Sequence, residues 1–71
     1  EVDFIKIENK HSLKPDLVGY EIKYKDKIKP QDTKGLIHFD KKYHLQEKII
    51  ISKSVNETIG EVKVIDFTMI G

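Results

Sequence analysis

The chain has 71 residues and a mass of 8.3 kDa, which suffices for one small domain and excludes two separate hydrophobic cores. Thirteen basic and twelve acidic residues give a net charge of +1, so charge alone does not indicate a nucleic-acid partner. The absence of cysteine excludes disulfides, thiolate metal sites and a cysteine nucleophile. No apolar run approaches the roughly 18 residues of a membrane span, and no signal-peptide pattern opens the chain. We therefore expect a cytoplasmic protein without a membrane partner.

All thirteen basic residues are lysine, and both arginine and alanine are missing. Arginine supplies the rigid fork that reads guanine edges, so its absence argues against sequence-specific base recognition. Lysine still neutralises phosphates as a point charge. Eleven isoleucines favour strands over helices.

The first half of the chain predicts two strands. Residues 2–7 form a dense β-branched and aromatic run, and residues 17–24 form a second one. The polar connection between them, residues 8–16, contains Pro15. Because a connection of this length is too short for a parallel crossover, we expect an antiparallel hairpin.

A helix is expected from Lys29-Pro30 to Tyr43 or His44. Pro30 suits the first helical position, and Asp32 in the first turn complements the helix dipole. Leu36, Phe39 and Tyr43 then recur at spacings of three and four, with Ile37 beside them, which predicts one apolar stripe facing a sheet.

The second half predicts two more strands. Residues 48–52 are an apolar run bounded by lysines, which is typical of a strand buried on both faces. Residues 54–60 are expected to form a polar turn, and residues 61–67 a last strand at an edge of the sheet. The predicted fold is α/β, with a mixed sheet in the order β-β-α-β-β.

One helix covers only one face of a sheet. A second helix is therefore expected from chain outside these residues or from a partner molecule, and the uncovered face would also favour a homodimer. The chain starts at Glu1 rather than Met and stops on an apolar stretch. We expect residues 1–71 to be a single domain from the C-terminal part of a larger protein.

The candidate site combines Asp3 on the first strand with Glu21-Ile22-Lys23 on the second. Side chains alternate along a strand, so Glu21 and Lys23 project to the same side, and strand pairing brings Asp3 beside Glu21. Two carboxylates and a backbone carbonyl make an oxygen-rich site suited to Mg²⁺. A neighbouring lysine would hold or deprotonate a metal-bound water.

An acid two residues before a lysine is not a specific signal here, because the chain contains five such pairs. Only Glu21-Ile22-Lys23 follows a strand that carries its own acid within an apolar run. An unpaired carboxylate at Asp3 would be costly to bury there, which favours a metal or cationic partner. The competing interpretation is a solvated sheet rim with incidental salt bridges. The five pairs are Glu8-Asn9-Lys10, Glu21-Ile22-Lys23, Asp32-Thr33-Lys34, Asp40-Lys41-Lys42 and Glu61-Val62-Lys63.

Six segments in order along nearly the whole chain resemble the PD-(D/E)XK nuclease superfamily. More narrowly, they resemble the nuclease-like domain at the C-terminal end of archaeal and bacterial AAA-type ATPases. The resemblance implies a truncated restriction-endonuclease-like fold, whose opening helix would precede Glu1. The segments are Glu1-Val2-Asp3-Phe4-Ile5, Gly19-Tyr20-Glu21-Ile22-Lys23-Tyr24, Lys29-Pro30-Gln31-Asp32, Lys34-Gly35-Leu36, Phe39 and Ile49-Ile50-Ile51-Ser52.

By this resemblance, Asp3 and Glu21 match the two metal-binding acids and Lys23 matches the catalytic lysine. The expected cofactor is Mg²⁺ or Mn²⁺, held by Asp3, Glu21 and the Ile22 carbonyl. The expected activity is phosphodiester hydrolysis, beside an ATPase domain in the same full-length chain, since the chain itself carries no phosphate-binding loop. The alternative from another class is a catalytically inactive module that docks protein or DNA beside the ATPase. A structural β-α-β piece with a chance motif also remains open.

Lysines alternate at positions 23, 25, 27 and 29, so they project to one side for as long as the strand persists. One interpretation is a row that tracks the nucleic-acid backbone, with Lys25 and Lys27 as contacts. The other is protection of an edge strand, for which lysine is favoured. Lys34, early on the helix, is either a further backbone contact or a solvated surface lysine.

Overall fold

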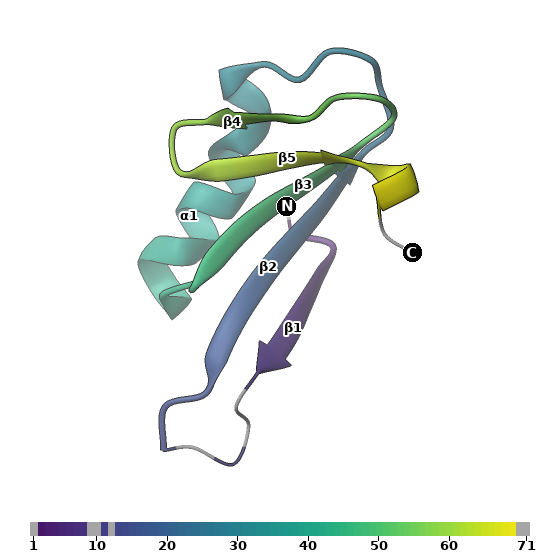
Figure 1. The fold of residues 1–71 in the computed structure, drawn as a ribbon. Helices are drawn as coiled ribbons and strands as arrows, with labels where there is room; N and C mark the ends of the chain where they lie inside the picture. Colours follow the sequence, from purple (N-terminus) through teal and green to yellow (C-terminus); the bar gives the residue numbers. More distant parts are fainter. Residues whose placement is uncertain (1, 9–10, 12, 70–71) are drawn as a thin grey trace.

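The structure, a computed structural model, describes residues 2–8, 11 and 13–69 as a five-stranded sheet with one α-helix (Figure 1). The predicted α/β class is confirmed. In this part of the chain, no helix is both long and apolar enough to cross a bilayer. The elements in chain order are β1 (Phe4–Glu8), β2 (Asp16–Lys23), the 3₁₀ helix η1 (Pro30–Thr33), α1 (Lys34–Tyr43), β3 (Glu47–Ser52), β4 (Glu57–Ile59), β5 (Val62–Asp66) and the 3₁₀ helix η2 (Phe67–Met69).

The strands lie in the order β1-β2-β3-β5-β4. β1 and β2 form the expected antiparallel hairpin, with Phe4 opposite Tyr20 and Glu8 opposite Asp16. β3 runs parallel to both of its neighbours, β2 and β5. The sheet is therefore mixed, and β3 lies at its centre. Five of the six β3 residues are buried, which confirms that the isoleucine run is buried on both faces.

β4 was not expected from the sequence, and it changes the place of the last strand. Residues 57–59 pair antiparallel with β5 across a two-residue turn, Gly60-Glu61. Gly60 has a φ of 60°, which glycine adopts without strain and which is typical of a type II′ hairpin turn. The prediction that β5 is an edge strand is wrong, because β4 covers that edge. The observed order is thus β-β-α-β-β-β.

Together, η1 and α1 begin and end where the sequence predicts a helix. Pro30 opens η1, and α1 continues from it to Tyr43. His44 then adopts a left-handed conformation with a φ of 54°, and its N–H donates to the Asp40 carbonyl at 2.8 Å. This conformation ends the helix, because a continued helix needs negative φ.

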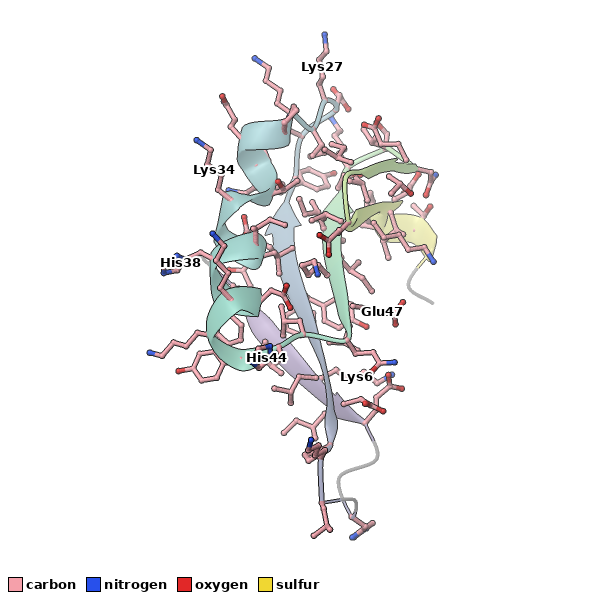
Figure 2. All side chains as sticks on the ribbon, turned by 90° about the vertical axis from the view of Figure 1, so that its left-hand side faces the viewer. Lys6, Lys27, Lys34, His38, His44 and Glu47 are labelled. Atoms are coloured by element: carbon pink, nitrogen blue, oxygen red, sulfur yellow. The ribbon has the colours of Figure 1, made fainter. Side chains whose placement is uncertain are left out.

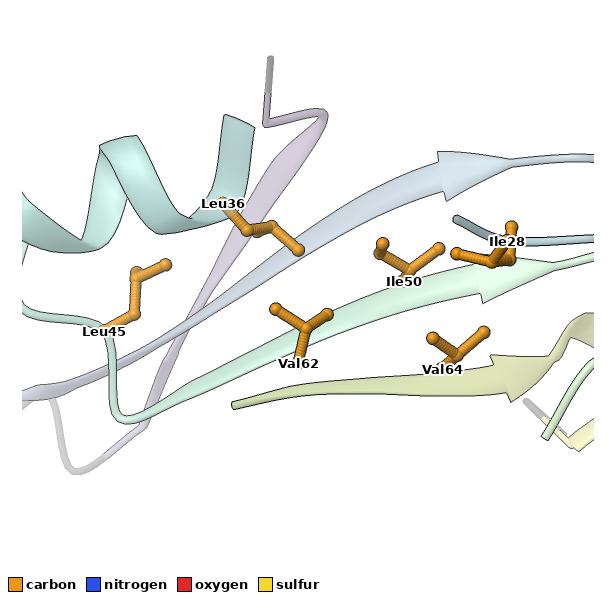
Figure 3. Close-up of a cluster of buried hydrophobic side chains, with 6 residues drawn as sticks. All are labelled: Ile28, Leu36, Leu45, Ile50, Val62 and Val64. Carbon is orange, nitrogen blue, oxygen red and sulfur yellow. The ribbon is translucent and has the colours of Figure 1, made fainter. Parts of the chain in front are cut away.

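The helix covers one face of the sheet, as Figure 1 shows. The main hydrophobic core lies between them, with Leu36 of α1 packed above the strands (Figure 3). A smaller cluster on the opposite, uncovered face includes Val18, Ile49 and Ile51. Phe4 stacks on Tyr20 beside it, with ring centroids 4.7 Å apart. The main core comprises Ile28, Leu36, Leu45, Ile50, Val62 and Val64.

Gly19 lets the helix approach β2 closely. A Cβ at this position would lie 2.7 Å from Leu45 Cδ1 and 3.1 Å from Leu36 Cδ2, both shorter than ordinary van der Waals contacts. We expect Gly19→Ala to lower the free energy of unfolding by about 1 kcal/mol, because these two leucines must shift in a packed core. Chemical denaturation monitored by circular dichroism measures this change.

The matched test combines Gly19→Ala with Leu45→Ala. Removing the Leu45 methyl groups makes room for the new Cβ, so the double variant should lose less stability than the two single variants added together. Strict additivity would contradict the overpacking explanation.

Candidate functional site

Asp3 immediately precedes β1 and lies beside the end of β2. Phe4 is opposite Tyr20, and the Asp3 N–H also donates to the Tyr20 carbonyl at 2.9 Å, so the regular pairing of the two strands ends at Phe4. The Asp3 side chain then reaches the next peptide of β2, where Oδ2 accepts the Ile22 N–H at 2.6 Å. The Asp3 carboxylate therefore lies against the peptide between Glu21 and Ile22, at the end of β2.

The Glu21 side chain projects to the face covered by α1. Glu21 is in register with Ile50, which belongs to the main core, and only 3% of Glu21 is exposed. Lys23 lies two residues after Glu21 on β2, and its Nζ is 3.1 Å from Glu21 Oε2. The Lys23 side chain is 37% exposed, so the pair links a buried carboxylate to solvent.

The hydrogen bond and the charge of Glu21 raise the pKa of Lys23 above its ordinary value. The charges of Asp32 and Asp3 act in the same direction. A raised lysine pKa means that the stability contributed by the Lys23 ammonium is fully present below the ordinary lysine value as far as Lys23 is concerned, and is lost as the pH rises through the raised pKa. Lys23 is therefore an ammonium ion at neutral pH.

Asp32, expected from the sequence only as a residue of the first helical turn, is a neighbour of Lys23 in this site. Its Oδ2 accepts the Lys29 N–H at 2.8 Å, and its Oδ1 pairs with Lys25 Nζ at 2.9 Å. The Lys29 N–H lowers the pKa of Asp32 most, and Lys25 and Lys23 add to the effect. The position of Asp32 depends on how the loop after β2 folds back, which no local spacing indicates.

The lysine row predicted beyond Lys23 does not continue as a strand, because β2 ends at Lys23. The Lys25 N–H donates to the Lys23 carbonyl at 2.8 Å, so the chain turns there. Lys25 is paired with Asp32, whereas Lys27 and Lys34 are exposed and project away from the body of the molecule (Figure 2). Lys25, Lys27 and Lys34 remain predictions as nucleic-acid contacts.

The donors at this site are oxygen atoms, which suit Mg²⁺ or Mn²⁺. Asp3, Glu21 and Lys23 sum to a charge of −1, so the group still attracts a cation. Within residues 2–8, 11 and 13–69, no cluster of three or more His, Asp or Glu side chains could hold a metal ion. A metal here would therefore need the Ile22 carbonyl, water or substrate oxygens in addition to the two carboxylates.

Two surface hollows lie away from these residues. One, of about 400 Å³, lies between the start of β2 and the end of α1, and Lys14, His44 and Gln46 are among its lining residues. The other, of about 380 Å³, lies on the uncovered face around Phe4 and Tyr20.

Comparison of the chain with protein-family models, with curated proteins and with solved structures finds no match. The resemblance to PD-(D/E)XK nucleases therefore stays a prediction. Among the five acid-x-Lys pairs, the structure places Glu21-Ile22-Lys23 beside an acid from a neighbouring strand. Glu8-Asn9-Lys10 includes two residues outside the described part of the chain.

Proposed function

We propose that this chain is a nuclease-like domain that hydrolyses phosphodiester bonds in nucleic acid with the help of Mg²⁺ or Mn²⁺. The observation that carries the proposal is that the Asp3 carboxylate accepts the Ile22 N–H, next to Glu21, with Lys23 Nζ 3.1 Å from Glu21 Oε2. In the full-length protein the domain would stand beside an ATPase domain, in the cytoplasm.

Asp3 and Glu21 would hold the cation, together with the Ile22 carbonyl. The Ile22 N–H holds the Asp3 carboxylate against the end of β2. Burial of Glu21 in the core restricts the motion of its side chain. Both acids are thus positioned before any ligand arrives, which lowers the cost of assembling the site. The cation would lower the pKa of a bound water and neutralise charge that develops on the phosphate.

Lys23 acts in this proposal as a hydrogen-bond donor rather than as a base. Its pKa is raised by Glu21, so the proton stays on Nζ at neutral pH. An ammonium at this position holds the attacking water or a non-bridging phosphate oxygen by a charge-assisted hydrogen bond. The side chain is partly exposed and flexible, so it can turn from Glu21 towards a substrate.

The alternative is a nuclease-fold module that binds nucleic acid without cleaving it. The specific observation in its favour is that both carboxylates next to the lysines are already neutralised, Glu21 by Lys23 and Asp32 by Lys25. In such a module the ion pairs would serve stability alone.

The test is metal-dependent cleavage of end-labelled DNA and RNA, together with calorimetric titration of Mn²⁺. The proposed function expects cleavage that requires Mg²⁺ or Mn²⁺ and stops with chelator. Mn²⁺ binding without cleavage of any substrate would support the inactive module. Absence of both Mn²⁺ binding and cleavage would contradict the proposed metal site.

A further inference from the structure

The charge of this chain is strongly polarised between its helical segment and the rest. Residues 27–44, named here the helical segment, contain five lysines and two aspartates, a net charge of +3. The whole chain carries +1, so the remaining residues carry −2. The near-neutral total therefore conceals a basic layer on one side of the molecule.

Both aspartates of the helical segment are only partly exposed and are already engaged. Asp32 is bound to the Lys29 N–H and to Lys25. Asp40 accepts the Leu45 N–H at 2.7 Å with Oδ1, and its Oδ2 lies 3.4 Å from the buried Lys48 Nζ. Their ion pairs are thus with Lys25 and Lys48, which lie outside the helical segment.

All five lysines of the segment are exposed, and three of them lie on α1. Positions 34, 38 and 41 follow the four-and-three spacing of one helix face, and Lys42 lies next to them. Figure 2 shows Lys34 and His38 on the outer side of α1, directed away from the sheet. Over its ten residues α1 is about 15 Å long, which corresponds to about four base pairs along a duplex.

This basic face starts at the candidate site. Asp32, whose charge raises the pKa of Lys23, lies two residues before Lys34. Lys27 and Lys29, at the start of the helical segment, lie on the loop that joins the end of β2 to η1. A polyanion whose phosphate lay at Lys23 would therefore meet the lysines of the helical segment as it left the site.

We propose that the outer face of α1 is a contact surface for the nucleic-acid backbone, formed chiefly by Lys34, Lys41 and Lys42. The inference rests on the proposed function, in that it takes nucleic acid as the polymer at the site. Lysines contact phosphates without reading bases, so the binding is independent of sequence and sensitive to salt. An anionic membrane is less suitable, because the exposed positions 34, 38, 41 and 42 carry no apolar side chain to enter a bilayer.

The experiment measures binding of fluorescein-labelled single-stranded and duplex DNA and RNA of about 20 nucleotides by anisotropy, in EDTA so that no cleavage intervenes. We expect Lys34→Glu/Lys41→Glu to weaken binding about tenfold or more. The slope of log affinity against log salt should become less steep by about 2, because two phosphate contacts are lost. The matched control is Lys6→Glu/Lys63→Glu, which makes the same change in net charge with two exposed lysines on the uncovered face.

Unchanged binding by the helix variant, or equal weakening in both variants, would overturn the inference. Binding of wild type to phosphatidylserine vesicles but to none of the nucleic acids would overturn it in favour of a membrane surface. Circular dichroism checks that both variants are folded. If only the helix variant loses binding and the wild type does not cleave, the contact surface is supported and the proposed nuclease activity is overturned. If the wild type cleaves and the helix variant binds as wild type does, the nuclease activity is supported and the contact surface is overturned.

Discussion

Replacing Glu21 by Gln is expected to lower metal-dependent cleavage by at least about 100-fold, because it removes one of the two carboxylates that would hold the cation. The substitution keeps the shape of a side chain that is only 3% exposed, so the fold should persist. Single-turnover cleavage of labelled DNA and RNA in Mg²⁺ or Mn²⁺ measures the rate. The same substitution removes the main cause of the raised Lys23 pKa, so that pKa should fall towards its ordinary value, which NMR titration detects.

The matched control is Glu47→Gln, which makes the same chemical change at an exposed position at the start of β3. It should cleave as wild type does. Lys23→Ala should be impaired like Glu21→Gln, while Lys63→Ala on the opposite face should not. Wild-type rates for both Glu21→Gln and Lys23→Ala would show that these residues do not catalyse the reaction.

Replacing Leu36 by Ala is expected to cost about 3 kcal/mol of unfolding free energy. Leu36 is completely buried at the centre of the main core, and the small core offers few side chains to fill the cavity (Figure 3). A domain of this size has only about 5 kcal/mol of stability, so the variant should be largely destabilised. Thermal unfolding by circular dichroism should show a midpoint lower by roughly 15 °C.

Two further substitutions control for this effect. Leu36→Met nearly conserves volume and should cost less than about 1.5 kcal/mol. Leu13→Ala removes the same atoms from a fully exposed leucine and should leave the midpoint unchanged. Equal effects of Leu36→Ala and Leu13→Ala would mean that the helix does not pack on the sheet as described.

The sequence predicted those elements whose burial produces a regular pattern of apolar residues. Residues 48–52 lie at the centre of the sheet and are buried on both faces, and their apolar run reflects this. The apolar stripe of α1 reflects contact on one side only, with Leu36 buried and Tyr43 nearly half exposed. β4 was missed because its three residues are mostly exposed and flanked by Asn56 and Gly60, so that its pairing with β5 leaves no periodic signal.

The same distinction applies to the candidate site. Alternation and hairpin pairing are local rules, and they were enough to predict that Asp3 lies next to β2, where its carboxylate accepts the Ile22 N–H. The lysines after Lys23 were extrapolated along a strand that ends there, because a turn depends on contacts that spacing does not reveal. Asp32 joins the site through the return of the chain at η1, which is likewise a tertiary effect.

The hydrogen bond between the Ile22 amide and Asp3 also couples the site to local opening of the sheet. β1 is an edge strand that pairs with β2 alone, and four of its five residues are exposed. It should therefore exchange its amide hydrogens at a lower free energy than the buried β3. When β1 opens, Asp3 leaves while Glu21 and Lys23 stay on β2, so a ligand that bridges both acids binds only the closed state. The apparent affinity of such a ligand then includes the free energy of closing β1. Binding of the ligand would slow the exchange of amide hydrogens in that strand.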